Sequence, residues 1–475
     1  METESILQIL VLAIGFYMAW NIGANDVSNA MGTSVGSGAL TLRRAVILAA
    51  IFEFCGAYFV GANVSETMQK GLIDTTLFLT DPTTLIMGMC GALLGTGIWL
   101  QIASFFGWPV STTHAIVGAI IGFGLIAVGV DAILWGEVMS IVFSWILTPV
   151  ISAFIAYSIF FILQKNILYA LNPTEAAIKM MPYLVFVVFT VFTASFMFNG
   201  LENLHLAFSS LQVIGLSLLV GFIGAAITFF IMKKVSLKQS LVATLPAKGA
   251  TQNVVSVGKA MKHLQRIVIS SKDETHARAS NLLKEVKALS LELRKETDIG
   301  ERTSHYAIVE RLFIYLQILS ACYVAFAHGA NDVANAIGPV AAVLEIIKKG
   351  VIPATASVPS WLLALGGLGI IIGLATWGWR VIETVGRKIT ELTPTRGFCA
   401  EFGAATTILI ASKLGFPIST THCLVGAVLG VGAARGIRAI NLSMVRDIIL
   451  SWIVTIPASA VMSILMYYLL RAIFI

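Results

Sequence analysis

Long apolar blocks alternate with short polar segments along the whole chain. The blocks lie near 6–33, 42–62, 83–106, 109–130, 138–164, 182–199, 211–232, 312–344, 360–379, 397–414, 417–434 and 447–474. Most approach the length of about 20 residues that a helix needs to cross a bilayer. They lack the strict alternation of apolar and polar positions that is typical of a transmembrane β-barrel. The pattern therefore predicts an all-α polytopic protein embedded in a lipid bilayer.

Composition narrows the class further. Of the 475 residues, 57% are hydrophobic and 12% are charged, whereas a soluble domain carries roughly 25% charged residues. A soluble fold of this size could not bury so much apolar surface with so few charged residues to cover it. Composition thus excludes a cytosolic enzyme, a secreted disulfide scaffold and a disordered chain.

One segment, 233–311, carries the excess positive charge. It holds 15 Lys/Arg and 8 Asp/Glu, while the whole chain has a net charge of +6. A basic loop between apolar blocks is typical of the cytoplasmic side of a membrane protein. Apolar residues recur in it every three or four positions, at Leu282, Val286, Leu289 and Leu293. This spacing predicts an amphipathic helix over 277–302, which we interpret as a solvated cytoplasmic helix, and we predict no nucleic-acid partner.

Three motifs occur twice, in the same order and at nearly constant separation. They are GANDVSNA at 23–30 and GANDVANA at 329–336, PVSTTH at 109–114 and PISTTH at 417–422, and SWIL at 144–147 and SWIV at 451–454. The separations are 306, 308 and 307 residues, which chance does not explain. The chain therefore consists of two homologous halves of about five apolar blocks each, with two further blocks inserted between them.

The number of blocks between the two GAND motifs sets the relative orientation of the halves. Seven blocks separate the motifs, and five crossings remain if 83–106 and 109–130 form a re-entrant hairpin. Both numbers are odd, so we expect two inverted-topology repeats, the arrangement of many secondary transporters. Each repeat is expected to contain a broken helix and a re-entrant helical hairpin. With the basic loop in the cytoplasm, both termini are expected outside.

These observations predict a division of the chain into four parts. Residues 1–164 form the first transmembrane repeat, and residues 312–475 form the second. Between them, 165–232 provide linking transmembrane helices, and 233–311 form the basic, partly helical cytoplasmic loop.

The GAND motifs place polar residues inside otherwise apolar helices. A carboxylate in the hydrocarbon region is costly and marks a functional site by default. The glycines allow the helix either to unwind or to approach a neighbour closely, and amide and carboxylate oxygens suit a hard cation. The alternative is that Asn and Gly merely hold packed helices together, which does not explain an aspartate in both motifs. The candidate Na⁺ ligands are Asn25, Asp26, Asn29, Asn331, Asp332 and Asn335.

The two STTH motifs have the features of helix starts. Proline is tolerated in the first helical turn, and Ser and Thr are capping residues. A helix that begins at membrane depth directs free N–H groups and a positive dipole end into the protein, which favours an anion. The alternative is a simple cap of a buried helix, but the duplication and the nearby Gly107 and Gly415 favour a site. The candidate anion ligands are Ser111, Thr112, Thr113, Ser419, Thr420 and Thr421.

Other polar residues in apolar blocks are weaker candidates. Glu53 and Glu401 do not match each other in the repeat and could serve ion coupling or a structural pair. His114 and His422 could relay protons, although a packing role is slightly favoured. His328 occurs only in the second half, where Ile22 is the matched residue.

The absence of basic residues points to a mechanism. No Lys or Arg occurs from 71 to 164, so an anion at the first STTH motif has no basic clamp and lies near carboxylates. Cations bound at the GAND motifs would offset that charge. The sequence thus favours a symporter that binds cations before the anion.

At these residues the chain resembles the inorganic phosphate transporter (PiT) family of secondary carriers. The resemblance rests on the duplicated GANDV-[SA]-NA and P-x-STTH motifs. It implies an inverted-repeat fold, inorganic phosphate as substrate, with sulfate as the alternative anion, and Na⁺ or H⁺ as coupling ion. The neutral oxygen ligands of the GAND motifs favour Na⁺ over H⁺. Phosphate would contact the STT hydroxyls together with Asn25 and Asn331, and the family's acidic residues fall on Glu53 and Glu401.

The resemblance also implies how the protein works and where it resides. We expect a phosphate symporter of the cell membrane that operates by alternating access, with no organic cofactor and a homodimer as a possible assembly. An intramembrane phosphohydrolase is a remote alternative, because a catalytic site needs different groups for nucleophile and base, whereas both halves here carry the same groups. A channel is a further alternative.

Overall fold

The structure is a computed structural model that describes residues 2–70, 72–200, 208–242, 257–258, 260–261, 263–269, 273–297, 301–352, 357–379, 381–382, 392–436 and 442–474. Over these residues the chain is almost wholly helical, with one isolated β-bridge between Ile73 and Ile133 and no strand. Seven of the described helices are long and apolar enough to cross a membrane, or eight if one bent pair counts as a single span. The expected all-α polytopic membrane fold is confirmed.

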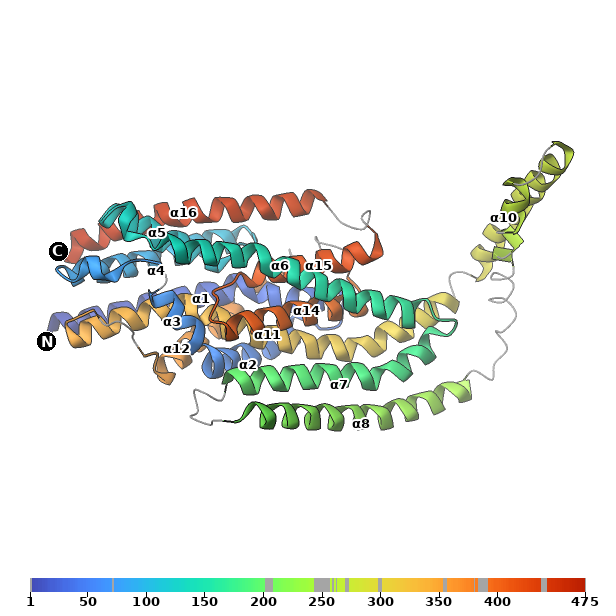
Figure 1. Cartoon of the computed structure of the whole chain (residues 1–475), viewed down its shortest axis with the longest axis horizontal. Coiled ribbons are helices and arrows are strands. Elements are labelled where there is room, and N and C mark those ends of the chain that lie inside the picture. The colour runs from blue at the N-terminus through green and yellow to red at the C-terminus, as the bar shows by residue number, and fades with distance from the viewer. Residues whose placement is uncertain are drawn as a thin grey trace. The chain divides into compact units, whose positions relative to one another are not determined.

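The helices can be divided into a first half, a second half and a group between them along the chain (Figure 1). The first half contains α1 (Glu2–Gly36), α2 (Leu42–Val60), α3 (Ala62–Lys70), α4 (Pro82–Phe105), α5 (Thr112–Ala127) and α6 (Trp135–Leu163). The second half contains α11 (Glu301–Lys349), α12 (Ser360–Thr376), α14 (Pro394–Lys413), α15 (Thr420–Arg435) and α16 (Leu442–Phe474). Between the two halves in the sequence come α7 (Pro173–Gly200), α8 (Ser210–Val242) and α10 (Asp273–Thr297).

The chain forms two compact units. Unit 1 combines 1–163, 186–222 and 313–475, and so brings the membrane helices of both halves together. Unit 2 combines 164–185 with 223–312. Within unit 2, α10 confirms the predicted helix of the basic loop over 277–297, while residues 298–300 of the predicted range lie outside the described residues. Tyr306 donates a hydrogen bond to the carbonyl of Leu168 (3.0 Å).

Within unit 1 the last helix of each half packs against the hairpin of the other half. Helix α6 contacts α14 and α15, while α16 contacts α4 and α5. Helix α1 packs against α12 and against α4. The two halves are therefore interlocked, and the GAND and STTH motifs are buried within unit 1.

The GAND glycines permit close approach and do not interrupt their helices. Helices α1 and α11 are continuous through both motifs, so the broken helix expected in each repeat does not lie at these glycines. A Cβ at Gly23 would clash with the carbonyl of Ile370 on α12, and one at Gly329 would clash with the carbonyl of Glu53 on α2. Close backbone packing is thus the reason for glycine here. A bend of 61° lies elsewhere, between α2 and α3.

We expect Gly23→Ala to destabilise the protein, because its methyl group would overlap a backbone carbonyl that cannot rotate away. Overpacking of this kind costs about 1–3 kcal/mol. The measurement is the apparent melting temperature in detergent. The matched control is Gly215→Ala on α8, where a Cβ meets nothing within 4 Å. Equal melting temperatures for both variants would contradict this packing.

Each half contains a helical hairpin, α4–α5 in the first and α14–α15 in the second. Gly107 (φ +67°) and Gly415 (φ +73°) lie in the left-handed region at the two tips, where a side chain would be strained. Helix α5 has only 16 residues, fewer than the roughly 20 needed to cross a bilayer. Both glycines thus lie at the hairpin tips, as expected, and α5 is shorter than a helix that crosses a bilayer.

The first hairpin begins at a capped helix end outside the membrane span. Asp81 accepts hydrogen bonds from the backbone N–H (3.2 Å) and the hydroxyl (2.6 Å) of Thr84. The hydroxyl contact is the main reason that the pKa of the Asp81 carboxyl lies below its usual value. The charged form is therefore the form that stabilises the fold.

We expect Asp81→Ala to lower stability by about 1 kcal/mol, the usual effect of losing such a cap. Because the pKa is lowered in the folded protein, the contribution is present above the ordinary carboxyl pKa and is lost as pH falls through the lowered value. The measurement is the melting temperature as a function of pH, with Asp81→Asn as the matched variant. A melting curve for Asp81→Ala equal to that of the wild type at neutral pH would contradict the prediction.

Candidate functional site

Both STTH motifs begin a helix as the sequence predicts. Ser111 is the N-cap of α5 and accepts a hydrogen bond from the backbone N–H of His114 (3.2 Å). Ser419 is the N-cap of α15 and accepts one from the N–H of His422 (3.2 Å). The remaining N–H groups of each first turn, together with the positive dipole end, are available to an anion.

The two helix starts meet inside unit 1. Thr113 donates a hydrogen bond to the carbonyl of Ile418 (2.8 Å), and Thr421 donates one to the carbonyl of Val110 (3.5 Å). All six Ser and Thr residues of the two motifs are buried. The fold thus brings together two candidate anion-binding motifs that are 308 positions apart in the chain.

Asn25 and Asn331 hold the hairpin tips to the GAND helices. The Asn25 amide donates to the Ser104 hydroxyl (3.1 Å) and to the carbonyl of Trp108 (3.0 Å). The Asn331 amide makes the matched pair of contacts with Ser412 (3.0 Å) and the carbonyl of Phe416 (3.2 Å). Their N–H groups are therefore occupied in positioning the tips.

Asn29 and Asn335 connect each GAND helix to the hairpin of the other half. The Asn29 amide donates to the hydroxyl of Thr421 (2.8 Å) and to Asp26 Oδ1 (3.0 Å). The Asn335 amide donates to the hydroxyl of Thr113 (3.1 Å). These cross-links place one GAND motif beside the opposite STTH motif in both halves.

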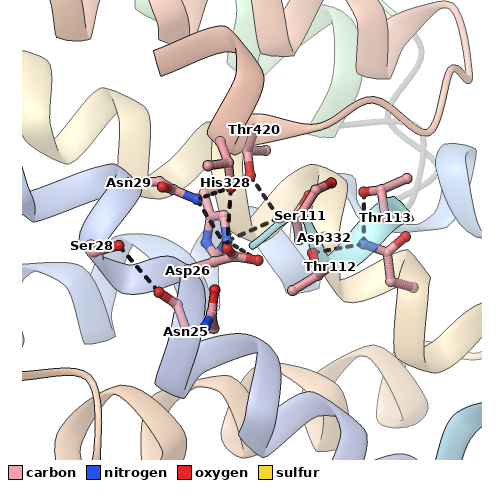
Figure 2. Close-up of polar contacts among 12 residues, drawn as sticks. Asn25, Asp26, Ser28, Asn29, Ser111, Thr112, Thr113, His328, Asp332 and Thr420 are labelled. Atoms are coloured by element: carbon pink, nitrogen blue, oxygen red, sulfur yellow. Dashed lines mark hydrogen bonds and ion pairs between the residues drawn. The ribbon is translucent and has the colours of Figure 1, made fainter. Parts of the chain in front are cut away.

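The two aspartates lie at the centre of this arrangement (Figure 2). Asp332 Oδ2 accepts a hydrogen bond from the Thr420 hydroxyl (2.9 Å), and Asp26 Oδ1 lies 3.4 Å from the Thr421 hydroxyl. Both side chains are buried. The carboxylates and the anion-binding helix starts therefore form one site.

A histidine to which the sequence assigned no role lies between the acids. His328 Nε2 is 3.0 Å from Asp332 Oδ2 and 3.9 Å from Asp26 Oδ2, and Nδ1 is 3.3 Å from Glu53 Oε1. Figure 2 shows its ring beside the two aspartates. The sequence could have indicated this histidine, because it lies one helical turn before Asp332 in an apolar helix. The matched residue of the first repeat is Ile22.

The cluster has more acceptors than donors. Three carboxylates face one imidazole, so the acids outnumber the one side chain between them that can offset their charge. No lysine or arginine contributes to the contacts that the described residues make here. Four buried oxygens of the described residues here have neither a hydrogen-bond nor an ion-pair partner: Asp332 Oδ1, Asn331 Oδ1, Asn335 Oδ1 and Glu53 Oε2. Unpaired oxygens beside excess negative charge fit a hard cation such as Na⁺.

Glu401 has a different environment from Glu53. Its oxygens accept hydrogen bonds from four neutral side chains on α1 and α11: Thr33 (2.5 Å), Ser34 (2.7 Å), Ser320 (2.5 Å) and Gln317 (3.3 Å). Glu53 contacts His328 and so joins the central cluster, whereas these four side chains already satisfy Glu401.

His114 and His422 pack against aromatic rings. The His114 ring centre lies 3.8 Å from that of Trp145, and the His422 ring centre lies 3.4 Å from that of Trp452. The two imidazoles also contact each other, with ring centres 4.4 Å apart. This stacking agrees with the packing role that the sequence slightly favoured.

Fold and site together define a class. A multi-pass membrane protein whose matched halves bring two helix starts and two buried aspartates to one interior site has the architecture of a secondary transporter.

Comparison with known proteins identifies the family. Residues 22–463 match the phosphate transporter family PHO4. A Chlamydia pneumoniae protein described as a phosphate permease is 46% identical, over 98% of this chain and 99% of its own length. The inorganic phosphate transporter 2-1, chloroplastic, of Arabidopsis thaliana is 42% identical, over 97% of this chain and 71% of its own length. A solved structure described as the sodium-dependent phosphate transporter is 35% identical with a TM-score of 0.76, over 98% of this chain and 100% of its own.

The chain belongs to the phosphate transporter family. It is a membrane-embedded phosphate transporter and not an enzyme. The family resemblance inferred from the duplicated motifs is therefore confirmed.

Proposed function

We propose that the protein carries inorganic phosphate into the cell together with Na⁺ by alternating access between the two repeats. The observation that carries this proposal is the charge of the interior site. Three carboxylates face one histidine beside two anion-binding helix starts. Phosphate adds further negative charge, so bound cations are needed before the site can hold it.

Phosphate is assigned to the two STT turns, with the hydroxyls of Ser111, Thr112, Thr113, Ser419, Thr420 and Thr421 as the proposed ligands. Asn25 and Asn331, whose amide N–H groups bond to the hairpin tips, are proposed to act on phosphate by positioning these turns. Free backbone N–H groups at the starts of α5 and α15 provide positive dipole ends. Because the two turns come from different halves, movement of one half against the other opens the site toward one side of the membrane at a time.

Na⁺ is assigned to the oxygens of the GAND motifs: Asn25, Asp26, Asn29, Asn331, Asp332 and Asn335. The buried oxygens without donors support this assignment, and Na⁺ coordination by such oxygens needs no proton transfer. Glu53 is proposed to contribute to coupling through His328. Glu401, which accepts hydrogen bonds from side chains of α1 and α11, remains a candidate for ion coupling. His114 and His422, which contact each other where the two hairpins meet, also remain candidates.

A second candidate is H⁺ coupling, which the position of His328 among three carboxylates favours. A cluster of titratable side chains could bind a proton in place of Na⁺. Sulfate is the alternative anion.

Uptake by proteoliposomes tests these proposals. Labelled phosphate is offered with an inward Na⁺ gradient, an inward H⁺ gradient or a K⁺ gradient as the control. Accumulation above equilibrium with Na⁺ alone supports Na⁺ symport, and accumulation with H⁺ alone supports the second candidate. Equilibration with every gradient would indicate a channel. Competition by excess sulfate measures the anion preference.

The location and organisation of the chain are part of the same proposal. We propose a cell-membrane location because the chain belongs to a transporter family. We propose both termini outside and 233–311 in the cytoplasm because that loop is basic. Figure 1 shows the marked chain ends on the same side of unit 1, which supports termini on one face. The division at residues 164, 232 and 311 into two repeats, linking helices and a loop, and a homodimeric assembly, are retained as proposals.

A further inference from the structure

Four aromatic rings form a column where the two hairpins meet. The order is Trp145, His114, His422 and Trp452, with successive ring centres 3.8, 4.4 and 3.4 Å apart. The tryptophans occupy matched positions on α6 and α16, in SWIL and SWIV. The column therefore follows the symmetry of the two repeats.

The hydrogen bonds of the column break that symmetry. Trp145 Nε1 donates to the carbonyl of Pro417 at the start of α15 (3.2 Å), and His422 Nδ1 lies 3.3 Å from the carbonyl of Trp145. The matched indole does not make the matched bond. Trp452 Nε1 is buried without a hydrogen-bond partner in the part of the chain that the structure describes.

The hydroxyl contacts between the hairpins are unequal in the same sense. Thr113 lies 2.8 Å from the carbonyl of Ile418, whereas the matched contact from Thr421 to Val110 is 3.5 Å. The α15 tip is thus held more firmly by the first half than the α5 tip is held by the second. A buried donor without an acceptor is rare in native structures and requires an explanation.

Alternation of the two repeats supplies that explanation. In a transporter built from inverted repeats, the halves can exchange their conformations as the site changes the side that it faces. A hydrogen bond that one half makes in one state is then made by the other half in the opposite state. A donor unpaired in one state has an acceptor in the other.

We infer that Trp145 and Trp452 are positioning residues that clamp the hairpin tips in turn. Here Trp145 holds the α15 tip through Pro417. In the opposite-facing state Trp452 Nε1 donates to the carbonyl of Pro109, which matches Pro417, and Trp145 releases its tip. The ring column persists in both states and serves as the pivot. This inference rests on the proposed alternating access.

Tryptophan-to-phenylalanine variants test the clamp, because they keep an aromatic ring and remove only the N–H and part of the surface. Trp452→Phe is the decisive variant, because it removes Nε1–H, a donor without a partner in this structure. Any effect of the lost N–H must therefore arise in another state. The matched control is Trp99→Phe on α4. Trp99 Nε1 is likewise buried without a partner, but position 407, which matches it in the repeat, is a threonine.

The first measurement is phosphate uptake by proteoliposomes. We expect Trp452→Phe to slow uptake by about fivefold, the effect of one lost hydrogen bond in a required state. Trp145→Phe should slow it similarly, and Trp99→Phe should leave it unchanged. If Trp452→Phe takes up phosphate at the rate of Trp99→Phe, the clamp is overturned.

The second measurement is deuterium exchange of the two tips, 106–111 and 414–419, in purified full-length protein. We expect Trp145→Phe to raise exchange at 414–419 relative to 106–111, and Trp452→Phe to shift this balance in the opposite direction. Shifts in the same direction, or no shift in Trp452→Phe, would overturn the clamp. If wild-type protein shows no cation-driven uptake, the proposed function fails, and exchange alone then decides the clamp.

Discussion

Asp26→Asn and Asp332→Asn are each expected to reduce cation-driven phosphate uptake by about a hundredfold. Each change keeps the shape of the side chain and removes one charged ligand from the proposed Na⁺ site. Hydrogen bonds and ion contacts of charged groups contribute about 1.5–3 kcal/mol, and each 1.4 kcal/mol is a factor of ten in affinity. The measurement is the initial rate of phosphate uptake at several Na⁺ concentrations. Loss of a Na⁺ ligand should raise the Na⁺ concentration that is needed for half-maximal uptake.

Stability separates a binding defect from a folding defect in these variants. Three buried carboxylates share one histidine, so neutralising one of them relieves repulsion, and the melting temperature should stay level or rise. The control is Asp131→Asn, an exposed aspartate of the loop before α6, which should take up phosphate normally. Normal uptake by Asp26→Asn or Asp332→Asn would remove that residue from the site.

Replacement of His328 is expected to give the largest loss of stability in the site. Among the contacts that the described residues make, the imidazole is the one side chain that lies within 4 Å of all three acids. Removing one partner of a buried ion pair costs about 3–5 kcal/mol, because the remaining charge stays buried and unpaired. We therefore expect His328→Gln to lower the melting temperature strongly in the absence of Na⁺, and saturating Na⁺ to recover part of the loss.

A second substitution shows whether charge is the cause. Glu53 Oε1 lies 3.3 Å from His328 Nδ1, so Glu53→Gln removes one of the charges that His328 offsets. The double variant His328→Gln, Glu53→Gln should therefore be more stable than His328→Gln alone. The exposed His263 provides a control, since His263→Gln should not alter the melting temperature. A double variant no more stable than the single one would show that packing around the ring, and not charge, is what His328 supplies.

Local rules accounted for much of the site. The starts of α5 and α15 were predictable, because capping by Ser111 and Ser419 depends on residues within one helical turn. The pairing of the two STTH motifs was predictable from their duplication, because similar halves with opposite orientation meet at a shared interface.

The rest of the site depends on contacts that no local pattern encodes. His328, Glu53 and Glu401 have no counterpart in the other half, so the repeat gave no information about their partners. Glu53 reaches the site because Gly329 allows the backbone of α2 to approach α11. Continuous helices at the GAND motifs were also not predictable, since the same glycines permit both unwinding and close packing.

The interlocking of the two halves has a consequence for synthesis of the chain. Gly118 on α5 lies against the backbone of Ile456 on α16, and Gly426 on α15 lies against the backbone of Pro149 on α6. The second hairpin finds its partner helix already made when it leaves the ribosome, whereas the first hairpin must wait for the last helix of the chain. Until α16 has been synthesised, the first STTH turn lacks the helix surface that covers α5 in the finished protein.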